Sequence, residues 1–166
     1  SLFEDDDEII NNDTIHMKDV ELVLRFFAFR QLGKFENNLN SFLDIYLNNA
    51  NNYSSDLLTQ LKRLFLETID FAYTLFDGHP FRLWSTKNNR QFSSKFAVRT
   101  IYDPLMQVLS QFLSKKNILL NKKITIQQDY VSFLIEHEED FSGKYQHKAT
   151  IEKRIALFDS FIEKYI

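Results

Sequence analysis

Apolar side chains recur at helical spacing along most of the chain. Beginning near Lys18 they return every three or four positions, which is the period of one face of an α-helix. The pattern predicts helices over residues 18–32, 39–47, 56–76 and 94–114, from about 125 to the Ser142-Gly143 pair, and over 149–165. We therefore expect an all-α fold, with residues 18–166 forming a single domain of five to six helices around a Phe-rich core.

Capping and breaking residues set the expected boundaries of these helices. Gly33 is expected to end the first helix, and Ser54 or Ser55 to cap the third. Pro104 lies within the fourth segment, so it should kink that helix or mark its true start. Thr125 stands three positions before Gln128, as in a capping box, so a helix should begin there, after an apolar linker.

The first predicted helix has almost no polar face. A helix that is apolar all round is a buried one, so we expect residues 18–32 to form the centre of the fold. Arg25 interrupts this helix. It is either a buried charge that organises the core or lines a cleft, or a cation that pairs with Glu21 or extends its head to solvent. We favour the structural role, because an unpaired buried charge is strongly unfavourable.

Composition supports the helical interpretation. The chain of 166 residues has 17 Phe, 7 Tyr and 1 Trp, and large rings bury much apolar area. Gly (3) and Pro (2) are scarce, which favours long helices over a fold with many tight turns. Residues 1–17 differ from the rest, because five consecutive carboxylates at 4–8 indicate a solvated acidic lead-in or tail.

Charge and cysteine content restrict the partners. The net charge of -3 argues against non-specific nucleic-acid binding by the whole surface. Cysteine is absent, which fits a reducing compartment, and no apolar run approaches the roughly 20 residues of a membrane span. We therefore expect a cytoplasmic protein with no membrane partner.

The sequence offers no recognisable catalytic constellation. No G-x-S-x-G or phosphate-binding glycine loop occurs, and no H-E-x-x-H pair. His137 is followed by three acids, but a single histidine on an amphipathic helix with a charged flank does not define a metal site. We predict no catalytic residue, no metal site and no cofactor.

A basic and aromatic stretch over residues 82–99 is the one candidate for binding. Cations can hold phosphates while a ring stacks on a base, which is how nucleic acid is bound without sequence recognition. The alternative is an exposed loop that Trp84 anchors to the core, and we favour it because the overall charge is negative. The candidate nucleic-acid-binding residues are Arg82, Trp84, Lys87, Arg90, Lys95 and Arg99.

Four segments resemble a bacterial family. Residues 19–29 contain E-L-V-L-R-F, and this segment is similar to one in GmrS-like proteins of modification-dependent restriction systems, which have a ParB-like N-terminal half. Residues 42–47, Pro80-Phe81-Arg82 and Arg154-Ile155 resemble further motifs of the same proteins. The likeness spans about residues 18–158, and its structural motif positions include Glu21, Arg25 and Arg154.

The resemblance implies a helical C-terminal half that packs beside a ParB-like domain of the same longer protein. The family's D-G-Q-Q-R motif and its H-N-H nuclease half have no counterpart in this sequence. No catalytic residue of the family can therefore be carried over. The implied role is a non-catalytic scaffold or regulatory domain in DNA restriction or phage defence, as part of a modification-dependent endonuclease. The alternative is a DNA-binding helical module that uses residues 82–99.

Overall fold

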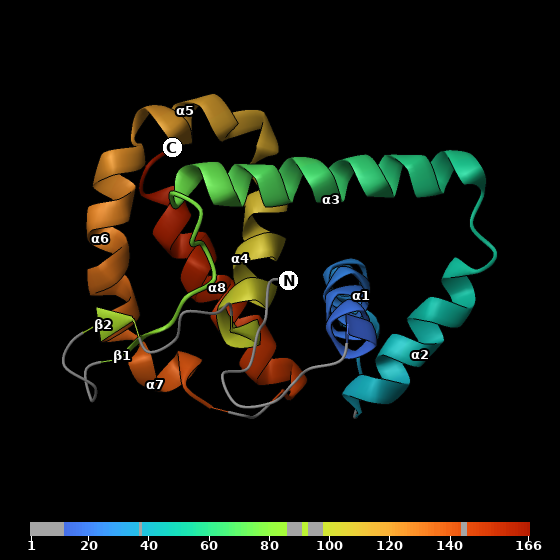
Figure 1. Ribbon diagram of the computed structural model, residues 1–166. Coiled ribbons are helices and arrows are strands. Elements are labelled where there is room, and N and C mark those ends of the chain that lie inside the picture. Colours follow the sequence, from blue (N-terminus) through green and yellow to red (C-terminus); the bar gives the residue numbers. More distant parts are fainter. Residues whose placement is uncertain (1–11, 37, 86–90, 93–97, 144–145) are drawn as a thin grey trace.

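A computed structural model describes residues 12–36, 38–85, 91–92, 98–143 and 146–166 (Figure 1). The side chains of 12–18, 85 and 91–92 lie outside the description, as do the acidic run, Lys87, Arg90 and Lys95. The described part of the chain is built from eight α-helices, two short 3-10 helices and one pair of two-residue strands. These elements are α1 (Asn12–Phe29), η1 (Leu32–Lys34), α2 (Leu39–Ala50), α3 (Ser55–Leu75), β1 (Trp84–Ser85), β2 (Gln91–Phe92), α4 (Arg99–Gln111), η2 (Leu113–Lys115), α5 (Lys116–Asn121), α6 (Lys123–Glu136), α7 (Glu138–Phe141) and α8 (Lys148–Glu163).

The all-α prediction is confirmed, but the helices outnumber the five or six expected. The predicted linker before residue 125 is helical, because Leu119 of α5 is buried in the core. The fifth predicted helix is divided into α6 and α7 at His137. Strands β1 and β2 pair antiparallel, with Trp84 opposite Phe92, and add only a short ribbon beside α6.

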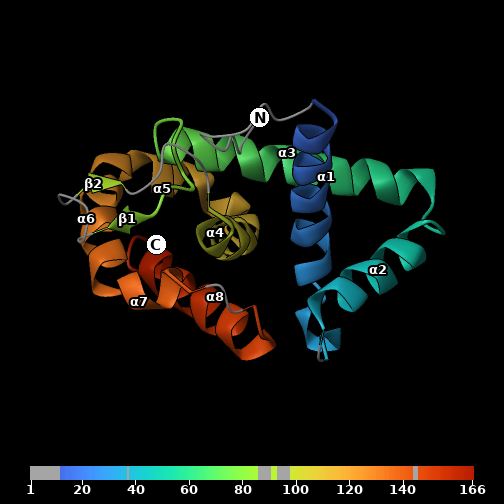
Figure 2. The same ribbon diagram turned by 60° about the horizontal axis from the view of Figure 1, so that its bottom comes forward.

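Helix α4 occupies the centre of the fold. All ten residues from Ile101 to Ser110 are buried, and α4 makes its most extensive contacts with α8 and α3 (Figure 2). The expected central helix was α1, and that prediction is wrong. Val20 of α1 is 66% exposed, so one face of α1 remains open although its sequence is apolar all round.

Several predicted boundaries are confirmed. The Ser54 hydroxyl caps α3 by accepting from the Leu57 N–H at 3.2 Å. Helix α3 ends at Leu75, before the break at Asp77-Gly78, where Gly78 has a φ of 82° and its N–H donates to the Tyr73 carbonyl at 2.9 Å. A Cβ is unfavourable at that φ, which explains a glycine at this helix end.

Other boundary predictions are wrong. Of the two roles expected for Pro104, marking the start of the helix is wrong, because α4 begins at Arg99 and Pro104 lies inside it. A kink at Pro104 stays a prediction. Helix α1 ends at Phe29, before Gly33, which lies in η1. Thr125 does not begin a helix, because the Ile126 N–H already donates to the Lys122 carbonyl at 3.0 Å and α6 follows closely on α5.

The Phe-rich core is confirmed and consists of two clusters. The larger joins α3, α4, α6 and α8, where the ring of Phe133 lies 4.6 Å from that of Phe161 and 5.1 Å from that of Phe158. The smaller joins α1, η1 and α2 to the start of α8 around Phe42 and Phe35, whose rings stack at 5.0 Å. Within the described residues, none of the helices has the length and apolar character needed to cross a membrane.

Candidate functional site

An arginine and an aspartate form a buried ion pair between α1 and α4. Arg25 is 1% exposed, and its Nε donates to Asp103 Oδ1 at 3.0 Å while its Nη2 donates to Asp103 Oδ2. Such a two-point contact fixes both the distance and the orientation of the two groups. The pair therefore holds α1 against the centre of the fold.

Further polar groups complete this Arg25 cluster. Glu21 accepts from Arg25 Nη1 at 3.5 Å and from Arg99 Nη2 at 3.0 Å, so it bridges two cations. Gln146, which precedes α8, accepts from Arg25 Nη2. The guanidinium also lies 5.0 Å from the centre of the Phe29 ring, a favourable position for a cation.

Arg154, in the first half of α8, ties this helix to the segment before it. It is 3% exposed, and its Nε donates to the Asp140 carbonyl at 2.7 Å, while its Nη2 lies 3.4 Å from the Gly143 carbonyl. These carbonyls belong to the C-terminal end of α7 and the residues after it, where backbone oxygens lack helical partners. Arg154 supplies those partners.

The electrostatics of the cluster favour a fixed ion pair. Burial is the largest influence on Arg25 and opposes its charge, but Asp103, Glu21 and Tyr102 together outweigh burial and raise the pKa of the guanidinium. Burial also raises the pKa of the Asp103 carboxyl, and Arg25 opposes that rise. Burial lowers the pKa of Arg154, while Asp103 and Asp140 act in the opposite direction. Arg25 and Asp103 therefore stabilise each other's charge, but burial still exceeds the effect of neighbouring charges at Asp103 and at Arg154.

The Glu21–Arg25 pairing expected from the sequence is confirmed, but it is not the main interaction. The main partner of Arg25, Asp103, was missed because it lies 78 positions away. One signal was available: Asp103 is an acid within an apolar stripe, as Arg25 is a cation within another. Of the three positions of the resemblance, Arg25 and Arg154 are buried, and Glu21 lies at the exposed end of the Arg25 cluster.

Two side chains of α4 reinforce the contact with α1. The Tyr102 hydroxyl donates to the Leu22 carbonyl at 3.1 Å, and the Gln107 amide donates to the Phe26 carbonyl at 2.8 Å. The Phe26 carbonyl lies in the last turn of α1, where carbonyls need partners from outside the helix. Polar side chains in the middle of the buried helix therefore fix the position of α1.

The candidate nucleic-acid residues do not form one described surface. Arg82 and Trp84 are half-buried, and Trp84 packs against the larger core cluster, which agrees with an anchoring role. Arg99 is paired with Glu21. Lys87, Arg90 and Lys95 lie outside the described residues, so nucleic-acid binding stays a prediction.

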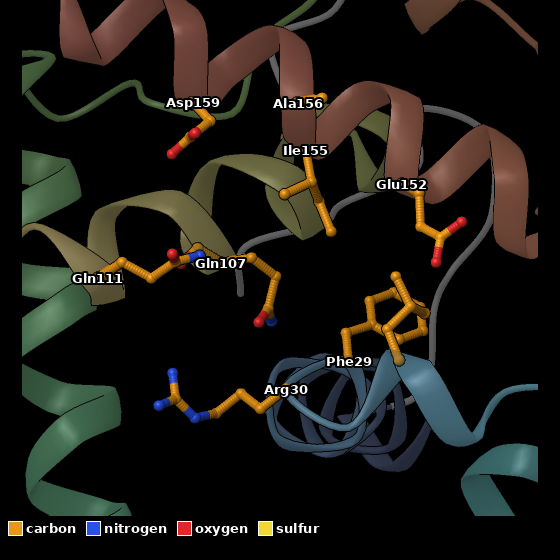
Figure 3. A pocket seen from close by; sticks show the side chains of 9 residues that line it. Phe29, Arg30, Gln107, Gln111, Glu152, Ile155, Ala156 and Asp159 are labelled. Atoms are coloured by element: carbon orange, nitrogen blue, oxygen red, sulfur yellow. The ribbon is translucent and has the colours of Figure 1, made fainter.

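A cavity of about 530 Å³ with a mixed polar and apolar lining opens between α1, α4 and α8 (Figure 3). Glu152 and Asp159 lie toward opposite ends of its α8 wall, two helical turns or about 10 Å apart. Arg30, at the end of α1, donates to the Ser110 hydroxyl at 2.8 Å, and the Gln107 amide is engaged by Phe26. This arrangement brings neither a carboxylate pair nor a nucleophile and base together.

Among the described residues, no three His, Asp or Glu side chains gather in a way that could hold a metal ion.

A second hollow differs from this first cavity in the chemistry of its lining. It is an apolar groove of about 490 Å³ between α1, α2 and α3, represented by Val20, Val23, Leu47, Leu58, Lys62 and Phe65. We call it the apolar groove.

The Arg25 cluster holds helices together. The apolar groove is suited to contact with another molecule rather than to catalysis. Comparisons of the chain with family models, with curated proteins and with solved structures found no match.

Proposed function

We propose that this chain is a non-catalytic helical scaffold or regulatory domain of a bacterial DNA restriction or phage-defence protein. In this role it supports a ParB-like nuclease or nucleotide-hydrolysing half of the same longer protein. The role implies a cytoplasmic location.

The observation that supports the proposal is that the two arginines of the resemblance are buried and hold helices together. Arg25 is 1% exposed and paired with Asp103, and Arg154 is 3% exposed and bonded to backbone carbonyls. Side chains engaged in this way hold helices together and are not accessible to a substrate. A rigid support for a separate catalytic half requires such fixed helix contacts.

The first test is an activity assay of the purified chain. We expect no nuclease activity and no nucleotide hydrolysis, with or without Mg²⁺. Metal-dependent cleavage by this chain alone, lost when the cavity-lining carboxylates Glu152 and Asp159 are changed to Gln and Asn, would contradict the proposal.

The second test adds a partner. A purified ParB-like half of a GmrS-like restriction protein is mixed with the chain, and complex formation is measured by calorimetry alongside nucleotide hydrolysis. We expect a complex and a changed rate of hydrolysis. If no complex forms and the rate of hydrolysis is unchanged, the scaffold role is contradicted, even if the chain itself is inactive.

A further inference from the structure

An apolar groove is left open where three helices of this chain surround it. We infer that the groove binds an amphipathic α-helix of a partner protein, one that carries a carboxylate beside its apolar face. This inference rests on the proposed scaffold role and specifies the chemistry of the partner segment.

The groove exposes side chains that a helical protein usually buries. Val20 of α1 is 66% exposed, Leu47 of α2 is 49% exposed, and Leu58 and Leu66 of α3 are 49% and 50% exposed. Single exposed apolar residues are ordinary, but these four line one continuous hollow. A contiguous apolar hollow of this kind is typical of a binding surface.

The walls of the groove are themselves helices that offer apolar side chains over about two turns each. Figure 2 shows α1, α2 and the first half of α3 as three sides of a triangle. The lining residues of α1, from Val20 to Phe27, and those of α3, from Leu58 to Leu66, each extend over about two helical turns, roughly 10–12 Å. An added helix would fit with residues at i, i+3, i+4 and i+7 as its anchors, because helices pack ridges into grooves.

Other kinds of occupant fit less well. A β-strand needs an exposed sheet edge, whereas the described walls are helical apart from Tyr53, so their backbone groups are already bonded. A small ligand is usually enclosed on most sides, and the high exposure of Val20 and Leu58 shows that this hollow is open.

Charge specifies the flank of the partner helix. Of the described residues that line the groove, Lys62 alone carries a charge, and no carboxylate lines it. Arg63 follows Lys62 on α3 and is 78% exposed at its side chain, but it pairs with Glu67 at 3.5 Å, so the charge argument depends on Lys62. A carboxylate next to the apolar face of the incoming helix would complement Lys62, whereas a cation there would be repelled.

A second copy of this chain is the strongest competitor. Helix α6 exposes Ile124, which is 73% exposed, and Ile135, which is 41% exposed and lies on the same helical face. However, Gln128 and the half-buried Val131 stand between them on that face. A contact between α6 and the groove would also be head-to-tail, which yields rings or open filaments rather than a closed dimer.

The test uses two synthetic helical peptides of roughly 16 residues, long enough to populate a helix. Both have Leu at i, i+3, i+4 and i+7; one has Glu beside this face, and the other has Lys. Binding of each labelled peptide to the full chain is measured by fluorescence anisotropy. Circular dichroism checks that every protein variant is folded.

We expect the Glu peptide to bind more tightly than the Lys peptide. Lys62→Glu should reverse this order, changing each affinity by a few-fold because the pair is exposed. Val20→Glu should lower the affinity for the Glu peptide by about tenfold or more, because it places a charge in the apolar interface. Ile124→Glu is the matched control, since it alters a similarly exposed apolar residue on α6, and it should leave peptide affinity unchanged.

Three results would overturn the inference. The first is no binding of either peptide to the folded chain, and the second is an equal loss of affinity in Val20→Glu and Ile124→Glu. The third is self-association of the unmodified chain that both variants abolish, since that outcome identifies α6 of a second copy as the occupant.

The inference and the proposed function fail separately. If the ParB-like half binds and Val20→Glu does not weaken that complex, the scaffold role stands and the groove is not its docking site. If the Glu peptide binds as expected but the ParB-like half does not, the groove has the inferred chemistry and its partner belongs to another protein.

Discussion

The two halves of α3 have similar apolar periodicity but opposite environments. In the C-terminal half, Phe71, Ala72 and Leu75 are fully buried against α4. In the N-terminal half, Leu58 is 49% exposed along the apolar groove, and Leu66, at the middle of the helix, is 50% exposed. An apolar stripe therefore shows which face of a helix can pack against another segment. It does not show whether that segment belongs to this chain.

Helix α1 contributes both to the packed core and to the open apolar groove. Its Leu22 and Phe26 lie in the larger core cluster, while Val20 and Val23 line the groove. The Arg25–Asp103 pair sets the orientation of α1, so it also determines which of its apolar residues stay open. Four predictions test this contrast between the packed region and the open one.

The largest effect should come from breaking the buried pair. Asp103→Asn leaves the Arg25 charge buried without its carboxylate, so we expect a loss of about 3–5 kcal/mol in the free energy of unfolding. Urea denaturation measures this, with Asp44→Asn on the exposed face of α2 as the control. The double variant Arg25→Met with Asp103→Leu should recover most of the loss, because it removes both charges. A single variant as stable as the control would contradict the role of the pair.

The two halves of α3 should respond differently to truncation. Phe71→Ala opens a cavity in the packed region and should lower the free energy of unfolding by about 3–5 kcal/mol. Leu58→Ala removes a side chain that is 49% exposed, so its effect should be within about 1 kcal/mol. Thermal unfolding followed by circular dichroism compares the two. Similar losses in both variants would show that the N-terminal half is covered in solution.

A smaller effect on the free energy of unfolding should come from Tyr46, which lines the groove, at alkaline pH. Burial, followed by the neighbouring Tyr53, raises the pKa of Tyr46 to about 12. In the unfolded chain this phenol loses its proton near pH 10, so the unfolded state binds fewer protons between about pH 10 and 12. The Tyr46 contribution to stability is therefore present below pH 10 and is lost as the pH rises toward 12.

Denaturant titrations at several pH values check this prediction. Tyr46→Phe should lose less stability than the unmodified chain between about pH 10 and 12, and should show the same pH dependence below that window. An identical decline in both proteins above pH 10 would show that the Tyr46 phenol is not protected by the fold.

The smallest effect should come from the exposed end of the Arg25 cluster. Glu21 is 37% exposed at its side chain and Arg99 is 42% exposed, so solvent screens their interaction. Glu21→Gln should lower the free energy of unfolding by about 0.2–1 kcal/mol. Glu67→Gln, which removes the partner of the exposed Arg63, is the matched control and should have a smaller effect, because Glu67 contacts no buried charge. A loss of several kcal/mol in Glu21→Gln would mean that Glu21 carries the pair that we assign to Asp103.

Local signals predicted local features well. The Ser54 cap, the break at Asp77-Gly78 and the last helix follow from residues close together in the sequence. The capping-box prediction at Thr125 was wrong because α5 precedes α6 directly, so the backbone is already helical there. That outcome depends on Leu119 being buried by the rest of the fold, which no neighbouring residue indicates.

By itself, the sequence determined that this chain is helical and aromatic at its core, since helix formation and periodicity depend on residues within a few turns. Only the tertiary structure decided that α4 is central, that Arg25 pairs with Asp103, and that the apolar groove remains open. These features depend on which helices meet. The ion pair joins positions 78 apart, and whether an apolar face is buried depends on a neighbouring helix that the face cannot specify alone.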